Sequence, residues 1–340
     1  MRFGRLKIFP LFLAILFVAG ASGEAQAQYY FGRNKIQYNQ FDWHIIKTRH
    51  FDIYFYPEME ELARVGAAYA EEAYRTLAAR FDQTVQRRIP LIFYSSHFHF
   101  EETNVVPYLI PEGVGGFFEY IKGRVVIPAN GSLADFHHVI WHELVHVFTH
   151  SKVSRVMKDN KKLQGAGLPL WFIEGIAEYW SQGWDTQAEM VLRDAVISGY
   201  LVPIEEMYQI SGTFLMYKEG QAVCRYIARR YGEVKLLQLF ENLWKGERFE
   251  LVLKETLGKD YRELDSEWLY WLKKQYFPLL EKEDLPHQIS PRITREGINT
   301  KPAFYREDGK PYVVFYSNRT GYSNIYRMPL TGLREERPRP

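Results

Sequence analysis

The stretch His142-Glu143-Leu144-Val145-His146 is the centre of this sequence. Two histidines four residues apart lie on one face of a helix, one turn apart, so both imidazoles can reach a single ion. Glu143 lies about 100° round the helix from His142, from the 3.6-residue repeat. It is therefore badly placed to join the same ligand set, but it is close enough to hold a water molecule bound to the metal. The stretch predicts a zinc site on a helix.

The alternative is a helix with two satisfied histidines, because so short a motif also arises by chance. Residues 133–141 carry apolar side chains at helical spacing, and Val145, Val147 and Phe148 continue the pattern. The helix is therefore expected to be buried. Two histidines and a glutamate on a buried helix are unfavourable unless something pairs with them, which favours the metal.

A catalytic zinc ion needs a third protein ligand and one open position. A second helix is predicted across 170–182, between a proline and a glycine, and Glu174 and Glu178 share one of its faces. Two carboxylates one turn apart repel each other without a cation. We assign Glu174 as the third ligand, and Glu178 as the acceptor for the free ring N–H of His142. The alternative, a solvated glutamate pair, is disfavoured by the apolar residues around them.

These two motifs together resemble the gluzincin metallopeptidases. The resemblance rests on His142-Glu143-x-x-His146 and Trp171-Phe172-x-Glu174-Gly175-x-Ala177-Glu178-Tyr179. It implies one zinc ion per chain and the following roles: ligands His142, His146 and Glu174, and general base Glu143. The segment between the two motifs is longer than in the best-known members, and we expect a basic loop there, from Lys152 to Lys162.

A strand is expected just before the metal helix. Residues 115–129 have strand character, most clearly Arg124-Val125-Val126-Ile127-Pro128. The gluzincin resemblance implies an edge strand that lies beside the zinc and pairs with the substrate backbone, and this stretch resembles that strand. Such pairing would bind peptides with little dependence on their sequence. An ordinary strand inside the sheet is the alternative.

The whole pattern predicts an α+β fold: a zincin-like metallopeptidase domain with a small mixed sheet and a mostly helical C-terminal half. Residues 28–48 are expected to be an extended lead-in. Alternation or helical spacing of apolar residues predicts strands at 50–56 and 89–94 and helices at 58–81, 191–197, 220–231, 234–243 and 264–276. The peptidase domain is placed at 28–282, divided into an α/β part at 49–130, metal helices at 134–182 and a helical part at 184–280.

Several further side chains are candidates for the site or for the core. Tyr217 is the candidate to stabilise negative charge on the reacting carbonyl, followed by Tyr226 and Tyr208, although any of them can be a buried aromatic with a bonded hydroxyl. His138 lies one turn before His142 and is assigned to the pocket or the core, not to the ligand set. Three further histidines, His97, His99 and His137, also lack a competing ligand spacing.

The two ends of the chain differ from the middle. Residues 1–27 combine a basic start, an apolar stretch and Ala25-Gln26-Ala27, which predicts a cleaved signal peptide and a bacterial exported protein, periplasmic, cell-surface or secreted. An uncleaved anchor is the alternative, but the apolar run is shorter than the roughly 20 residues that span a bilayer.

After a linker at 283–300, residues 301–340 resemble one blade of a TolB-type β-propeller. A propeller needs several blades, so we expect a fragment with further blades beyond it, rather than a vestigial blade.

Composition limits the other partners. The net charge is +2, which gives no electrostatic indication of a nucleic-acid partner, and no second segment is apolar enough to span a membrane. The single cysteine, Cys224, excludes an intrachain disulfide and falls in an apolar helical pattern. The expected partner is a peptide or protein substrate. Two other functions stay open: a non-catalytic zinc-containing binding module, and hydrolysis of a non-peptide amide or ester.

Overall fold

The computed structural model describes Lys35 and residues 37–330, except for the side chains of Pro286 and His287. The expected signal peptide and the last ten residues of the expected blade lie outside these residues. The chain divides into two compact units, Met1–Trp271 and Leu272–Pro340, and each unit contains one β-sheet.

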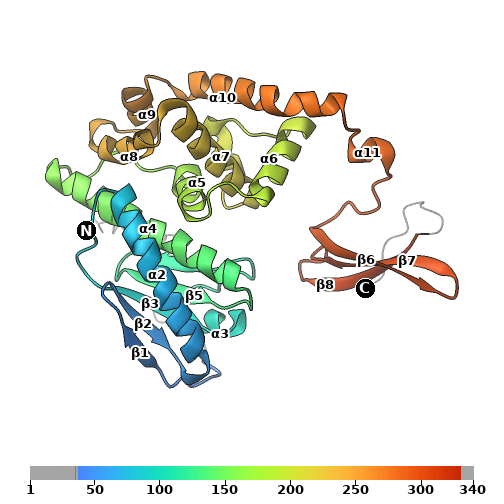
Figure 1. Ribbon diagram of the computed structural model, residues 1–340, viewed down its shortest axis with the longest axis horizontal. Helices are drawn as coiled ribbons and strands as arrows, with labels where there is room; N and C mark the ends of the chain where they lie inside the picture. Colours follow the sequence, from blue (N-terminus) through green and yellow to red (C-terminus); the bar gives the residue numbers. More distant parts are fainter. Residues whose placement is uncertain (1–34, 36, 331–340) are drawn as a thin grey trace, which may run out of the picture. The chain divides into compact units, whose positions relative to one another are not determined.

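The first unit contains a five-stranded sheet with the order β1-β2-β3-β5-β4 (Figure 1). The three inner strands are parallel, and the two edge strands run antiparallel to their neighbours, so the sheet is mixed. The strands are β1 His44–Lys47, β2 Phe51–Phe55, β3 Ile89–Tyr94, β4 Phe117–Glu119 and β5 Arg124–Pro128.

The strand order corrects two expectations. Arg124–Pro128 is not an edge strand, because β5 pairs with β3 on one side and β4 on the other. Its central residues are fully buried, as an inner strand requires. The edge strand beside it is the shorter β4. At the opposite edge, β1 lies within the stretch expected to be an extended lead-in, where its mostly exposed residues gave no alternating pattern.

Two long helices, α2 (Glu60–Arg80) and α4 (Leu133–Asp159), lie side by side over the sheet (Figure 1). The buried side of α2 is made largely of alanines and Gly66, which allow close approach to the strands. A Cβ on Gly66 would lie 2.6 Å from the ring of Phe93 in β3. Helix α4 begins at Ser132, whose hydroxyl accepts a hydrogen bond from the Asp135 N–H.

Helix α4 also corrects the expected basic loop from Lys152 to Lys162, because the helix continues to Asp159. Lys152 is buried, and its Nζ lies 3.0 Å from Oε1 of Glu241 and 3.1 Å from the carbonyl oxygen of Phe81. Its charge is thus paired inside the protein. Val156, one turn further, is buried too, so the apolar spacing of α4 extends through this segment.

The part of the first unit that follows α4 is mostly helical, and its helices lie beyond α4 from the sheet (Figure 1). Helix α9 was not expected, and α7 begins earlier than expected, at a Thr213 cap that accepts from the Met216 N–H. The helical segments of the unit not yet given are η2 Pro57–Met59, α3 His97–Glu101, α5 Leu170–Ser181, α6 Thr186–Ser198, η3 Ile204–Ile210, α7 Phe214–Tyr231, α8 Val234–Glu241, η4 Leu243–Lys245, α9 Phe249–Leu257 and α10 Tyr261–Tyr276, which crosses the division between the units.

Helices α5 and α7 cross at two glycines. A Cβ on Gly175 would lie 2.3 Å from the carbonyl carbon of Gly220, and a Cβ on Gly220 would lie 2.2 Å from the carbonyl oxygen of Trp171. The two backbones are therefore in direct contact, and no larger residue fits at either position without moving a helix.

The second unit contains an antiparallel sheet of three strands in the order β6-β7-β8. At the turn between the first two strands, Asp308 and Gly309 both have positive φ, as a type I′ hairpin requires. The sheet buries a small cluster on one face: Val313, Phe315, Tyr326 and Met328. The elements are η5 Phe277–Glu281, α11 Pro286–Ile289, β6 Asn299–Glu307, β7 Lys310–Ser317 and β8 Asn324–Pro329. The propeller blade and its continuation stay predictions.

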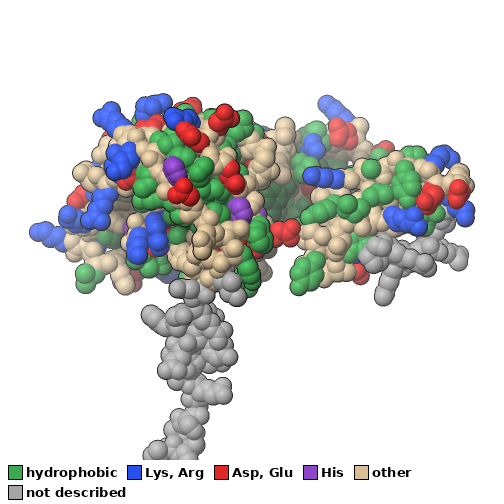
Figure 2. Space-filling view, turned by 90° about the horizontal axis from the view of Figure 1, so that it is seen from below, with side chains coloured by type: hydrophobic (Ala, Val, Ile, Leu, Met, Phe, Trp, Pro, Cys, Tyr) green, Lys and Arg blue, Asp and Glu red, His purple; other side chains and the backbone are tan. Residues whose placement is uncertain are grey.

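The expected α+β class with a small mixed sheet and a mostly helical second half is confirmed. Within residues 35 and 37–330, none of the helices has the length and apolar character needed to cross a membrane. Figure 2 shows histidine and acidic side chains close together within a hydrophobic area on one face of the first unit, with basic side chains round its rim.

We predict that Gly220→Ala destabilises the protein by about 1–3 kcal/mol, because the added methyl group overlaps the backbone of α5. Helix propensity alone would give the opposite sign, since alanine is favoured over glycine by about 1 kcal/mol inside a helix. Urea unfolding followed by circular dichroism measures the change. Gly167→Ala is the control, because a Cβ there has no neighbour within 4 Å. Equal stability of the two variants would contradict the close crossing.

Candidate functional site

Three side chains from two crossing helices converge where α5 packs on α4. The Nε2 atoms of His142 and His146 lie 3.1 Å apart. Oε2 of Glu174 lies 3.3 Å from the first and 3.4 Å from the second. The i, i+4 spacing places the two imidazoles one above the other on α4, and α5 supplies the carboxylate from the facing side. These three residues can hold a metal ion.

The electrostatics of the group support this. Burial disfavours the ionised form of Glu174, but hydrogen bonds with His142 and His146 outweigh it and lower its pKa to about 2. Burial likewise disfavours a charged His142, but hydrogen bonds with Glu174 and Glu178 raise its pKa to about 10. A negative carboxylate is thus held against the ring of His142, which binds a proton strongly, and a metal ion can take the place of that proton.

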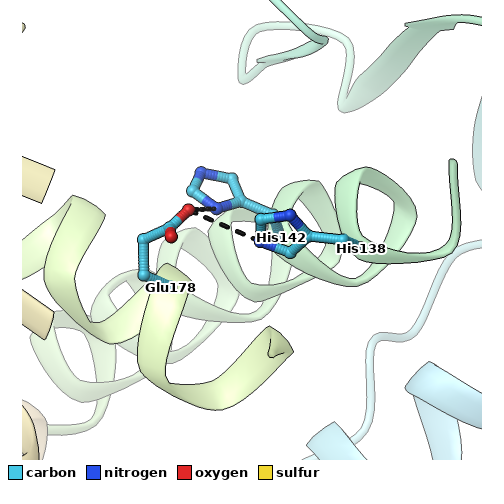
Figure 3. A group of neighbouring side chains, drawn as sticks. All are labelled: His138, His142 and Glu178. Atoms are coloured by element: carbon cyan, nitrogen blue, oxygen red, sulfur yellow. Dashed lines mark ion pairs between the residues drawn. The ribbon is translucent and has the colours of Figure 1, made fainter. Parts of the chain in front are cut away.

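Glu178 lies behind His142, one turn after Glu174 on α5. Its Oε1 lies 3.0 Å from Nδ1 of His142 and 3.5 Å from Nε2 of His138, and Figure 3 shows both contacts made by one carboxylate. Nδ1–H of His142 therefore donates to Glu178, which leaves its Nε2 for the group with His146 and Glu174. His138, His142 and Glu178 form a second group that can hold a metal ion, and this group shares His142 with the first.

Lys218 of α7 completes this arrangement. Its Nζ lies 2.5 Å from Oε2 of Glu178, and the lysine is 2% exposed. Burial raises the pKa of Glu178, but hydrogen bonds with His138 and His142 and the charges of His142 and Lys218 lower it far below its usual range. Glu178 is therefore an ionised carboxylate with both oxygens engaged.

Glu143 follows His142 on α4 and lies about 100° round the helix from it. It is 6% exposed, and burial raises the pKa of its carboxyl group although both neighbouring histidines oppose the shift. Gly116 lies against it: a Cβ built there would be 3.4 Å from Cγ of Glu143 and 2.9 Å from Val139. A side chain at this position would overlap Val139, so glycine lets the segment leading into β4 pass closely over α4 beside Glu143.

A cavity of about 480 Å³ opens in front of the three converging side chains. Glu143 and the residues around β4 form one side of it, so the edge strand borders the cavity. The rest of its wall is mostly uncharged and comes from α4, from β4 and the residue after it, and from the first turn of α5 and the segment that leads into it: Phe118, Tyr120, His150, Val153, Leu168 and Ile173.

Tyr217 also lines this cavity, and its ring lies 6.3 Å from that of His142, nearly parallel to it. Burial and the charges of Glu174 and Glu143 raise the pKa of its hydroxyl, which therefore keeps its proton and can donate it in a hydrogen bond. The two other tyrosine candidates lie elsewhere. Tyr226 packs against Trp271, and Tyr208 is 71% exposed on η3.

The remaining candidates from the sequence are not part of the cavity wall. His99 lies 2.8 Å from the hydroxyl of Tyr56, and His97 lies 3.3 Å from Glu101 on its own helix. His137 stacks edge-on with Tyr69. Cys224 is buried within α7, as expected of a core side chain.

The roles of Lys218 and Gly116 were not expected from the sequence, and within residues 115–129 the sequence did not distinguish the edge strand β4 from the inner strand β5. A lysine inside a helix that is almost wholly buried from Met216 to Cys224 was the available signal for the first. The Gly115-Gly116 pair was the signal for a close backbone approach. The edge position depends on strand order, which no local pattern encodes.

Comparison with protein-family models matches residues 70–274 to the Peptidase MA superfamily. The matched segment begins within α2, ends within α10, and covers more than half of the 340 residues. It contains every residue placed at the cavity above. A search of curated proteins finds no match.

We predict that the metal-free protein releases a proton when it binds a divalent metal ion at neutral pH. The pKa of His142 is raised to about 10, so the side chain is protonated there and must lose a proton before Nε2 can bind a metal. The apparent affinity should rise by up to about tenfold per pH unit below that value. Calorimetric titration in buffers with different ionisation enthalpies measures the protons released. Binding without proton release, or affinity that falls as pH rises, would show that His142 is not held in its charged form.

Proposed function

The chain belongs to the Peptidase MA superfamily, and on that premise we propose that it is an exported zinc-dependent peptidase of gluzincin type. His142, His146 and Glu174 hold the zinc ion, and Glu143 is the general base. The observation that carries the proposal is the convergence of three ligand atoms at the wall of a cavity that also contains Glu143. Export rests on the signal-like pattern of residues 1–27.

The donor set fits zinc in type and in spacing. Two histidines and one glutamate, with one position left open, are the ligands of a familiar class of catalytic zinc site. With zinc–ligand bonds of about 2.0–2.1 Å, a tetrahedral arrangement separates neighbouring ligand atoms by about 3.3–3.4 Å. The three separations here are 3.1, 3.3 and 3.4 Å. Little movement is needed to place an ion between them.

A zinc ion held by these three residues would lower the pKa of a bound water molecule to about 7 and would polarise a carbonyl oxygen. Glu143 accepts a proton from the attacking water and delivers it to the nitrogen of the leaving amine. Burial raises the pKa of Glu143, which makes its carboxylate a stronger base than an exposed one and suits it to accept that proton. The protonated hydroxyl of Tyr217 donates a hydrogen bond to the oxygen that becomes negative.

The cavity is suited to an extended peptide. The edge strand β4 offers backbone groups along one wall, and the uncharged side chains further along accept an apolar side chain of the substrate.

Two alternative functions, a zinc-binding module and hydrolysis of non-peptide substrates, require different groups in the cavity. A binding module that only holds zinc has no need of a buried carboxylate at Glu143, so that residue favours catalysis. Non-peptide amides and esters need the same groups, and a substrate screen separates them from peptides.

We expect Glu143→Gln to lower peptidase activity by a factor of about 10² or more, because the variant removes the base. Its zinc content should stay at one ion per chain, because no ligand is removed. Glu174→Ala should instead lose most of its zinc. Hydrolysis of a peptide library and elemental analysis of the same samples measure the two effects. Full activity of zinc-loaded Glu143→Gln would rule out the proposed mechanism. Absence of zinc from the wild type would rule out the zinc site.

Tyr217→Phe is expected to lower kcat by about 10²-fold with little change in KM, since the hydroxyl acts on charge that develops only in the transition state. Tyr226→Phe is the matched control, because that tyrosine lies outside the cavity wall. Steady-state kinetics on a single peptide substrate compares them. A change in KM alone would assign Tyr217 to substrate binding instead.

A further inference from the structure

Helix α7 contributes two consecutive residues to opposite sides of the metal group. Tyr217 lines the cavity, while Lys218 lies behind the group and pairs with Glu178. Lys218 is the more unusual of the two, since a lysine that is 2% exposed is rarely found without a compensating charge. Its ammonium group also lies 5.4 Å from the ring centre of Phe214, so an aromatic face adds to its surroundings.

The contact with Lys218 divides the two oxygens of Glu178 between different partners. Oε2 lies 2.5 Å from Nζ of Lys218, and Oε1 lies 3.0 Å from Nδ1 of His142. A carboxylate that is fixed at one oxygen loses freedom to rotate, so its second oxygen has a defined direction. Here Oε1 of Glu178 is directed toward the Nδ1–H of His142, a proposed zinc ligand. The contact between Lys218 and Glu178 thereby fixes which nitrogen of His142 faces the metal.

The same contact decides between the two possible metal groups. Both groups contain His142, but only the second, with His138, requires Glu178 as a ligand. A fixed positive charge 2.5 Å from Glu178 opposes the binding of a cation to that carboxylate. The group of His142, His146 and Glu174 has no lysine in contact with its carboxylate among the described ion pairs. A metal ion is therefore directed to the cavity side of His142.

We propose that Lys218 is a positioning residue for the metal site: it holds Glu178 as the hydrogen-bond acceptor of His142 and prevents Glu178 from acting as a metal ligand. The inference rests on the proposed zinc site and adds to it a residue on a third helix, remote from the substrate. It predicts that Lys218 acts on the metal through Glu178 and through no other contact.

Lys152 provides a matched comparison within the chain. It is also a buried lysine in an ion pair, 3.0 Å from Glu241, and it lies on the same helix as the two histidines. Its partners belong to neither metal group. Replacement of either lysine by methionine removes one buried charge of similar kind, so a general loss of stability is common to both variants.

The test uses the full chain with Zn²⁺ as the probe. The zinc dissociation constants of the wild type, Lys218→Met, Lys152→Met, Glu178→Gln and the double variant Lys218→Met/Glu178→Gln are measured by competition with a chromophoric chelator. Circular dichroism verifies folding, and Lys218→Gln replaces Lys218→Met if the latter does not fold. We expect zinc binding about 10–100-fold weaker in Lys218→Met, as for loss of other groups that orient a ligand. Lys152→Met should bind as the wild type does.

The double variant tests the route of the effect. If Lys218 acts through Glu178, the loss in the double variant equals that of Glu178→Gln alone, and the two substitutions are not additive. Additive losses of zinc affinity in the double variant would overturn the inference. A loss of zinc affinity in Lys152→Met equal to that in Lys218→Met would also overturn it, because the role of Lys218 would then be structural. Wild-type affinity in Lys218→Met would overturn it as well, with the zinc site intact. A wild type that binds no zinc would instead overturn the proposed function on which the inference depends.

Discussion

The contact between the backbones of α5 and α7 at Gly175 and Gly220 is the constraint on which the site depends. Glu174 directly precedes the first glycine, and Glu178 follows it by less than one turn. Tyr217 and Lys218 likewise precede Gly220, the second glycine, by less than one turn. A close crossing therefore brings the carboxylates of Glu174 and Glu178, a phenol and an ammonium group into one small volume. Side chains at the crossing would separate the helices by the width of those side chains, and Lys218 could no longer reach Glu178.

Helix α4 connects this crossing to the sheet. Its 27 residues extend over about 40 Å, at 1.5 Å per residue, so one rigid element packs against both the strands and the helical half. The histidines lie near its middle, where both layers meet. Helix α5 packs on it from one side, and the segment entering β4 passes Glu143 on another. The proposed base and the two histidines are thus fixed relative to each other by a single helix, while Glu174 and the remaining groups are brought to it by tertiary packing.

The local sequence pattern was sufficient to predict those site residues that recur at helical spacing along one helix. The i, i+4 histidines, the i, i+4 glutamates and the apolar spacing around them could be recognised without a structure, and the α+β class followed from the order of elements. Long-range facts could not be recognised in this way. Strand order made β4, not β5, the edge, and the partner of Lys152 is 89 residues away, so a buried lysine was taken for part of a basic loop. The role of Lys218 likewise required knowledge of which helix it faces.

The shortness of β4 limits how many residues of an extended peptide could pair with it, as the proposed function requires. At about 3.3 Å per residue, its three residues offer an edge of only about 10 Å. Beyond it the backbone turns away, because the carboxylate of Glu119 accepts from the N–H groups of Ile121 and Lys122 and closes the hairpin. A bound strand would find backbone partners for some three residues and then lose them. Recognition would be confined to a tripeptide-sized frame next to Glu143, and the same brevity gives other copies of the chain little edge on which to aggregate.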